Sequence, residues 1–464
     1  MGIHQIARAP IGTHDERIER GRAHREVVAL QGHAEVSLAR AGRDPVAILA
    51  AQDRMRRQDL VPIRHGRMCM TPFTFYRGAA AVMAADLATT ASTGLTVQLC
   101  GDAHLSNFGV FMGPDRRLVF DCNDFDETLP GPFEWDVKRL AASITVAARQ
   151  LGLTDKQARR ATRAGVRGYR ERMAACSLRE PIALHYERIE ADAAIDSLRG
   201  GATRKRAAKV VARAIRKDHV RAFGKLTEVI DGRRRIVDDP PAIEHFERWE
   251  GAVPMERILD FLERYRESLA PERRAVLDRY RIVDMAHKVV GVGSVGTRCF
   301  IVLLQSGEGH PLFMQFKEAT ASVLEAHLGP SEFAQSGERV VHGQRLMQSA
   351  GDILLGWSRF ERSDDDAGFD FYFRQLWDGK GSADVDRMTP EMLLQYAGTC
   401  GAALALGHAR STDPAIIAGY LGDSDAFDRA IQQFADAYAD RTEADHRAHA
   451  EAIDSGAIAV QLGV

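Results

Sequence analysis

A stretch rich in β-branched residues lies between two long helical regions and limits the folds open to this chain. Residues 289–316 are apolar and β-branched, and glycines interrupt them. Apolar residues recur at helical spacing over much of the chain before residue 230, and again from Thr389 onward. The pattern predicts an α+β fold, in which a mostly helical part is joined to a small antiparallel β part.

Composition removes several classes of function. The 464 residues are 45% hydrophobic and 27% charged, and a net charge of −2 gives no overall field that would favour nucleic acid or an anionic membrane. Six cysteines without C-x-x-C spacing make a zinc site or a disulfide framework improbable. The N-terminal sequence lacks the apolar core of a signal peptide, and no apolar run reaches the roughly 18 residues of a membrane span. We expect a cytoplasmic protein that binds neither nucleic acid nor membrane.

Two neighbouring segments carry polar residues suited to phosphoryl transfer. Asp102 and Asn107 lie in a loop that leaves a short apolar run, and Asp124 and Asp126 stand at the end of the next apolar run. Phosphoryl transfer requires the phosphates and metal to be held in line, with a carboxylate to orient the attacking hydroxyl. Asp102 fits the carboxylate role. Asn107, Asp124 and Asp126 fit a Mg²⁺ site, since this ion is held by a few carboxylates, amide oxygens, waters and substrate phosphate.

Other interpretations of these residues stay open. Asp, Asn and Gly are also common turn formers at the ends of strands. A metal hydrolase is a further alternative, because carboxylates and imidazole suit transition metals, but neither an HExxH motif nor a second histidine accompanies the segment. His104 itself can orient Asp102, contact phosphate or only pack the loop. The residues considered for the hydrolase are Asp102, His104, Asp121, Asp124 and Asp126.

A glycine motif downstream predicts a nucleotide-binding flap. Residues 289–296, VVGVGSVG, contain G-x-G-x-x-G, which is a weak signal alone. A dinucleotide site requires a helix after the third glycine, whereas the β-branched run that follows here predicts a strand. A glycine loop between two strands suits a flap whose backbone approaches a triphosphate. The residues expected at the nucleotide are Gly291, Gly293, Ser294 and Gly296.

Lys317 ends the next predicted strand, residues 312–317. An unpaired ammonium is costly to bury, so Lys317 should have an anionic partner. A resemblance to kinases implies that this partner is the α- and β-phosphates of a nucleotide, with a helix glutamate holding the lysine. The candidates on the following helical segment are Glu325, Glu332 and Glu338, and Glu325 is the one included in the predicted site. The alternative is a surface lysine on an edge strand.

The segments GDAHLSNFG and VFDCNDFDET resemble the catalytic and metal-binding segments of aminoglycoside phosphotransferases and choline kinases, which are relatives of protein kinases. The resemblance implies that Asp102 is the catalytic aspartate and that Asn107 and Asp124 bind metal, with ATP and Mg²⁺ as cofactors. Asp136, in GPFEWD, resembles a buried scaffold carboxylate of those enzymes. Cys100 departs from the pattern, because these families usually have His there.

The order of the parts differs from that of kinases. FYFRQLW (371–377) resembles the strand that leads into the adenine-binding hinge, and CGAALALGHARSTD resembles the helix that directly precedes the catalytic loop. Here that loop comes before the glycine loop in sequence. The resemblance therefore implies a protein-kinase-like two-lobed fold that is circularly permuted and has helical additions, a change that surface termini make tolerable. The alternative is two separate domains that each hold half of the pattern.

A division of the chain follows from these motifs and from the Gly, Pro and mixed-charge boundary at 232–245. We predict an N-terminal helical segment (1–60), the catalytic-loop part of the helical lobe (61–175), a helical insertion or connector (176–280), the glycine-loop β lobe (281–380) and C-terminal helices that complete the helical lobe (381–464).

Taken whole, the chain is similar to the bacterial family called domain of unknown function 2252. RMCMTPFTFYRG at 67–78 and RVVHGQRLMQSAGD at 339–352 add to the motifs above. That family name supplies no substrate, and the sequence gives no oligomeric state. The expected function is an ATP- and Mg²⁺-dependent phosphotransferase acting on a small-molecule or protein hydroxyl. Nucleotidyl transfer on the same fold and a catalytically silent nucleotide-binding module that regulates a partner remain alternatives.

Overall fold

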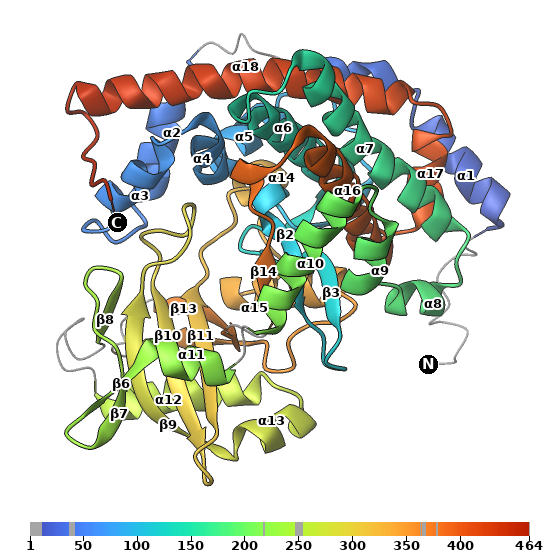
Figure 1. Ribbon diagram of the computed structural model, residues 1–464. Coiled ribbons are helices and arrows are strands. Elements are labelled where there is room, and N and C mark those ends of the chain that lie inside the picture. Colours follow the sequence, from blue (N-terminus) through green and yellow to red (C-terminus); the bar gives the residue numbers. More distant parts are fainter. Residues whose placement is uncertain are drawn as a thin grey trace.

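A mostly helical part, which also holds small antiparallel sheets, is joined to a part built on a six-stranded antiparallel sheet (Figure 1). All the strand pairs are antiparallel within the part of the chain that the structure describes. The protein therefore has a mixed α+β architecture. The computed structural model describes residues 12–36, 42–216, 219–245, 254–361, 363, 368–376 and 379–463.

The helical part is built around α6 (Phe133–Gln150), whose residues are buried on every side from Phe133 to Ala148. Helices α7 (Asp155–Ser177), α16 (Pro390–Ser411) and α18 (Ala426–Asp454) pack around it. In Figure 1, α18 runs along one edge of the molecule, across the ends of the other helices. Smaller helices in the later chain are α8 (Pro181–Tyr186), α9 (Ala191–Ser197), α10 (Gly201–Ile215), α14 (Glu325–Leu328), α15 (Ser336–Met347), η5 (Val385–Arg387) and α17 (Pro414–Leu421).

The N-terminal region forms several short helices. The segment from Phe75 to Leu87 is divided between two helices, because Ala79 leaves the helical conformation at φ −110° and ψ 34°. The first of the two begins before Phe75, where Thr71 and Pro72 supply a capping box and a proline in the first turn. The elements are α1 (His14–Ala23), η2 (Leu30–Ala34), α2 (Pro45–Asp53), α3 (Val61–Met68), α4 (Pro72–Gly78) and α5 (Ala80–Leu87).

The two apolar runs around the polar loop form strands of different sheets. The first run is β1 (Thr96–Leu99), which pairs with β4 (Leu129–Pro132). The second is β3 (Leu118–Cys122), which pairs with β2 (Phe108–Met112), a strand that the sequence did not predict. Strands β14 (Gly381–Ser382) and β5 (Ile189–Glu190) complete a sheet of order β14-β2-β3-β5. The polar residues therefore lie where β1 ends, where β2 begins and where β3 ends.

The β part is a six-stranded sheet of order β12-β13-β11-β10-β9-β8. The predicted strands near 297–304 and 312–317 are β10 and β11, and the predicted strand at 371–377 is β13, with residue 377 outside the described residues. Helix α12 (Met255–Glu267) packs one face through Phe261 and Tyr265, and α11 (His219–Leu226) packs the other. Strand bounds are β8 (Ile243–His245), β9 (Tyr280–Lys288), β10 (Cys299–Ser306), β11 (Pro311–Glu318), β12 (Gly356–Phe360) and β13 (Phe369–Gln375).

The predicted boundary at 232–245 falls on β structure. It contains β7 (Arg233–Ile236), which pairs with β6 (Thr227–Ile230), and also β8, the edge strand of the six-stranded sheet. The sheet thus takes a strand from the segment expected to be a helical connector. Helix α13 (Pro271–Leu277) leads from this segment into β9. No helix within the described residues is long and apolar enough to cross a membrane.

Candidate functional site

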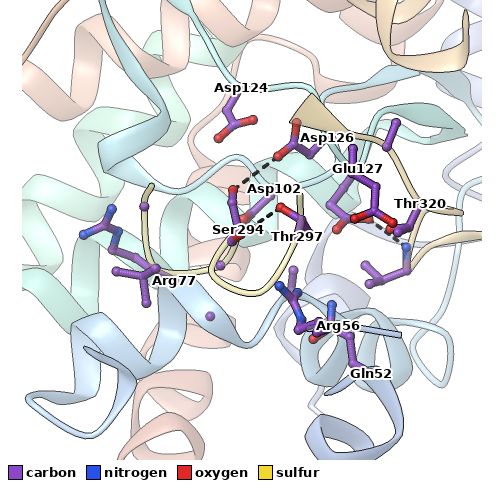
Figure 2. Close-up of a pocket in the computed structure, with 18 of the residues that line it drawn as sticks. Gln52, Arg56, Arg77, Asp102, Asp124, Asp126, Glu127, Ser294, Thr297 and Thr320 are labelled. Carbon is purple, nitrogen blue, oxygen red and sulfur yellow. Dashed lines mark hydrogen bonds between the residues drawn. The ribbon is translucent and has the colours of Figure 1, made fainter. Parts of the chain in front are cut away.

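A cavity of about 220 Å³ lies where the helical part meets the glycine loop. Its walls come from the loop after β1, the segment after β3, the loop between β9 and β10, and helices α2 and α4 (Figure 2). Segments that are far apart in the sequence therefore meet at one point. Of the residues predicted for the site, the cavity is lined by Asp102, Asn107, Asp124, Asp126, Gly291, Gly293 and Ser294.

A buried carboxylate fixes the loop that carries Asp102. Asp136, at the start of α6, accepts hydrogen bonds from the backbone N–H groups of Cys100 (2.8 Å) and Gly101 (3.1 Å), and its side chain lies 3.2 Å from Nε2 of His408. Gly101 has φ +85°, and a Cβ there would stand 2.1 Å from the carbonyl oxygen of Glu127, so only glycine fits. Asp136 is 1% exposed. The prediction of a buried scaffold carboxylate is confirmed.

The Asp102 side chain is held from α6 and stays accessible from the cavity. Nε of Arg139 donates to Oδ1 at 2.8 Å, and Nη2 of Arg139 donates to the Tyr76 carbonyl. Burial raises the pKa of Asp102 to about 6, although the Arg139 guanidinium opposes that rise. His104 lies 3.7 Å from Oδ2, too far for a hydrogen bond. Burial and the nearby Arg77 lower the pKa of His104, so its ring is neutral near pH 7.

Asn107 and Asp124 offer oxygen atoms to a cation. The amide nitrogen of Asn107 donates to the Asp102 carbonyl at 2.9 Å, which leaves its side-chain oxygen free of that bond. Oδ1 of Asp124 is buried and has no hydrogen-bond partner among the described residues. Such an atom is costly to bury unless a ligand satisfies it, and a carboxylate with an amide oxygen suits Mg²⁺. These two residues fit the predicted metal.

Asp126 does not fit that metal in the observed arrangement. Nζ of Lys317 donates to its Oδ2 at 2.5 Å, and Ser294 Oγ donates to the same atom at 3.4 Å. The Tyr372 hydroxyl donates to Oδ1 at 2.6 Å. Lys317 outweighs the effect of burial and lowers the pKa of Asp126. Both carboxylate oxygens are engaged, so Asp126 acts here as the partner of Lys317 instead of as a metal ligand.

Lys317 has an anionic partner among the described residues, the carboxylate of Asp126, and its predicted contact with nucleotide phosphates stays a prediction. It lies on β11, which pairs with β10 on one side and β13 on the other, so the edge-strand alternative is wrong. Its side chain is 3% exposed and contacts Asp126. None of the three candidate glutamates contacts it among the described residues. Glu325 instead accepts from the backbone N–H groups of Ser322 (2.9 Å) and Ser331 (3.3 Å).

An arginine that sequence reasoning missed joins α15 to the segment after β3. Arg339 is 2% exposed and donates to the carbonyl oxygens of Asp126 (2.9 Å), Thr128 (2.6 Å) and Thr320 (2.8 Å). Its Nε lies 3.7 Å from Glu325. The helix therefore positions Asp126 through an arginine and the main chain. The sequence signal for this buried arginine was its place beside two valines, on the apolar side of the helical part of the motif at 339–352.

The glycine loop connects β9 to β10 and is held by the N-terminal helices. Nη1 of Arg56 donates to the Val295 carbonyl at 2.6 Å, and the N–H of Arg57 donates to the Gly296 carbonyl at 2.8 Å. Arg67 donates to the Gly291 carbonyl. The side chains of Val292 and Val295 pack in apolar clusters with α2, α3, α4 and α5. Sequence reasoning assigned no role to these arginines, although Arg67 begins the motif RMCMTPFTFYRG at 67–78.

The end of α16 lies beside the strand that leads into the Asp102 loop. The N–H of Gln98, in β1, donates to Oγ of Ser411 at 2.9 Å. Tyr396, also on α16, donates to the carbonyl oxygens of Leu105 (3.0 Å) and Phe108 (2.9 Å). The helix expected to precede the catalytic loop is therefore adjacent to it in space, although it follows that loop in the sequence.

Among the described residues, no three His, Cys, Asp or Glu side chains lie close enough together to hold a metal ion.

Comparison with curated proteins finds no match, and neither does comparison with solved structures. A family model matches residues 56–452, which is most of the chain. The chain therefore belongs to the family described as "Uncharacterized protein conserved in bacteria (DUF2252)".

Proposed function

We propose that this protein is an ATP- and Mg²⁺-dependent phosphotransferase that acts on a hydroxyl group of a small molecule or protein. One observation carries the proposal: a single cavity collects Asp102, the pair Asn107 and Asp124, and residues 291–294 of the glycine loop. A carboxylate for the hydroxyl, oxygen ligands for the metal and a glycine-rich backbone for the phosphates are the parts that phosphoryl transfer needs.

Each residue has a defined task in this proposal. Asp102, fixed by Arg139, accepts a hydrogen bond from the acceptor hydroxyl and orients it; a pKa of about 6 keeps it ionised at pH 7. Asn107 and Asp124 hold Mg²⁺, which when bound neutralises charge on the phosphates. Lys317 exchanges its contact with Asp126 for the α- and β-phosphates, and the backbone of the glycine loop covers them.

The proposal includes a circularly permuted, protein-kinase-like arrangement. Four observations support it. The glycine loop joins two adjacent antiparallel strands, and Lys317 lies on the strand next to them. Helix α15 is tied to the segment after β3 by Arg339. The end of α16 lies against β1, beside the Asp102 loop.

The test is ATP turnover by purified protein with Mg²⁺ and a panel of hydroxyl compounds, followed with ATP labelled at either the γ- or the α-phosphate. We expect γ-label on an acceptor and loss of turnover in Asp102→Asn, with ATP affinity retained. Asp15→Asn is the matched control, since this side chain is fully exposed on α1. Equal turnover in Asp102→Asn would remove the proposed role of that residue.

Other outcomes separate the alternatives on the same fold. Transfer of the α-label to an acceptor identifies nucleotidyl transfer. ATP binding by the wild-type protein, without turnover on any compound of the panel, favours a silent nucleotide-binding module. Failure to bind ATP in the presence of Mg²⁺ contradicts all three functions.

A further inference from the structure

An arginine of the cavity wall has no hydrogen-bond or ion-pair partner among the residues that the structure describes. Arg77 lies on α4, in the motif RMCMTPFTFYRG, and its side chain lines the cavity. Its Nε is buried without a hydrogen-bond acceptor, and no ion pair within the described residues includes it. Arg56 lines the same cavity and its Nε also lacks a hydrogen-bond partner, but its Nη1 donates to the Val295 carbonyl and its Nε lies 3.8 Å from Oδ1 of Asp53. Among the described residues of the cavity wall, Arg77 is therefore the arginine that has neither a hydrogen-bond acceptor nor an ion-pair partner.

An arginine in this position is expected to meet an anion. Burial lowers the pKa of Arg77, but a guanidinium group stays protonated in proteins. The side chain therefore cannot avoid the cost of burying its charge by losing the proton. Asp102, Asp386 and Asp124 oppose that pKa shift from a distance, and none of them forms an ion pair with Arg77 in the described structure. Asp386 instead accepts a hydrogen bond from Gln150. A bound anion would supply the missing partner.

The location of Arg77 shows which part of a substrate it would meet. Of the carboxylates around it, Asp102 has the largest effect on its pKa, and Arg77 in turn lowers the pKa of His104. Figure 2 shows Arg77 on the opposite side of Asp102 from Glu127 and Thr320. Lys317 contacts Asp126 and Ser294, at the glycine loop. The two cations therefore face different carboxylates, because Lys317 pairs with Asp126 and Arg77 interacts most strongly with Asp102, while the Arg77 backbone adjoins Gly293 of the glycine loop.

We propose that Arg77 binds an anionic group of the acceptor, so that the acceptor is a hydroxyl compound carrying a phosphate or carboxylate. This inference rests on the proposed function, in which Lys317 serves the nucleotide and Asp102 the acceptor hydroxyl. The planar fork of a guanidinium matches both phosphate and carboxylate with two parallel hydrogen bonds. Arg77 is thus a specificity-determining residue of the acceptor side.

The experiment uses inorganic phosphate and acetate as probes of the full-length protein, by calorimetric titration. Each anion is titrated with and without a saturating complex of Mg²⁺ and the β,γ-imido analogue of ATP, which fills the terminal-phosphate position. We expect binding of at least one anion in both conditions, and binding at least about tenfold weaker in Arg77→Gln. The anion that binds more tightly identifies the acceptor group. Arg160→Gln, on the exposed face of α7, is the control and should bind as the wild type does.

The outcomes distinguish this inference from the function on which it rests. Equal anion binding by Arg77→Gln, or binding of neither anion by the wild type, overturns the role of Arg77. If the anion and the ATP analogue compete, Arg77 binds the terminal phosphate of the nucleotide, and its assignment to the acceptor is overturned. Absence of analogue binding with anion binding that still depends on Arg77 refutes the proposed function and supports the anion site. A thermal melt of Arg77→Gln that matches the wild type shows that the loss is local.

Discussion

The loop that carries Asp102 and the glycine loop face the same cavity but are held in different ways. The Asp102 loop is fixed from within the helical part, through hydrogen bonds to the buried carboxylate of Asp136 and from Arg139 to the half-buried carboxylate of Asp102. The glycine loop is held from outside by Arg56 and Arg67, which donate to its carbonyl oxygens. Arg139 and Asp102 join two opposite charges, and the fully buried Asp136 accepts two N–H groups, whereas each arginine at the glycine loop donates to a neutral carbonyl. The comparison indicates that the Asp102 loop is a fixed centre of the candidate site. The glycine loop is a cover of the cavity that is more easily displaced.

Asp136→Ala is expected to have the largest effect on this comparison. The change leaves the N–H groups of Cys100 and Gly101 without an acceptor and removes the partner of His408, all in a fully buried setting. We expect a loss of about 3–5 kcal/mol in the free energy of unfolding, measured by urea denaturation. Asp136→Asn, which keeps one acceptor, should lose less. A midpoint unchanged in both variants would show that the Asp102 loop is not fixed in this way.

Asp126→Asn is expected to have the next largest effect, because it leaves Lys317 without its anionic partner. Breaking a fully buried ion pair costs about 3–5 kcal/mol. The Asp126 side chain is 29% exposed, so we expect about 2 kcal/mol in the free energy of unfolding. Adding Lys317→Met to Asp126→Asn should recover part of the loss in a double-mutant cycle. Strictly additive losses would mean that the two side chains are not coupled.

The same pair predicts how stability depends on pH. The pKa of Asp126 is lowered in the folded protein, so its contribution is present above the pKa of an unfolded aspartate, about 4. That contribution is lost as the pH falls below this value. The acid limb of the stability curve should therefore be less steep in Asp126→Asn than in the wild type.

Activity should depend on the ionisation of Asp102. Its pKa of about 6 implies that the carboxylate form rises with pH between 5 and 7, so turnover at pH 5 should be about tenfold below its plateau. Arg139→Gln removes the cation that opposes the raised pKa, and the midpoint should move to higher pH. Arg160→Gln should leave the midpoint unchanged. A flat profile between pH 5 and 7 would exclude Asp102 as a group that must be ionised.

Local sequence patterns predicted several strands and the motifs, whereas contacts between segments far apart in the sequence decide which side chains pair with one another. Short apolar and β-branched runs located β1, β3, β10 and β11, and glycines before a β-branched run located the loop between β9 and β10. The pairing of Lys317 with Asp126 could not be read from spacing, because it depends on how the sheet docks on the helical part. The helix glutamate expected for Lys317 came from resemblance, and Glu325 contacts backbone N–H groups instead. Arg77 had no local signal, since an unpaired buried cation is recognised only once its surroundings are known.

The smallest expected effect concerns the cover itself. Arg56→Ala removes the hydrogen bond to the Val295 carbonyl, and we expect a loss of about 1 kcal/mol in the free energy of unfolding. Hydrogen exchange should rise at residues 291–296 and stay unchanged at 101–107, because Asp136 and Arg139 still hold that loop. Arg54→Ala, an exposed neighbour at the end of α2, is the control. Faster exchange in both loops would mean that they open as one unit, and the distinction between a fixed centre and a displaceable cover would fail.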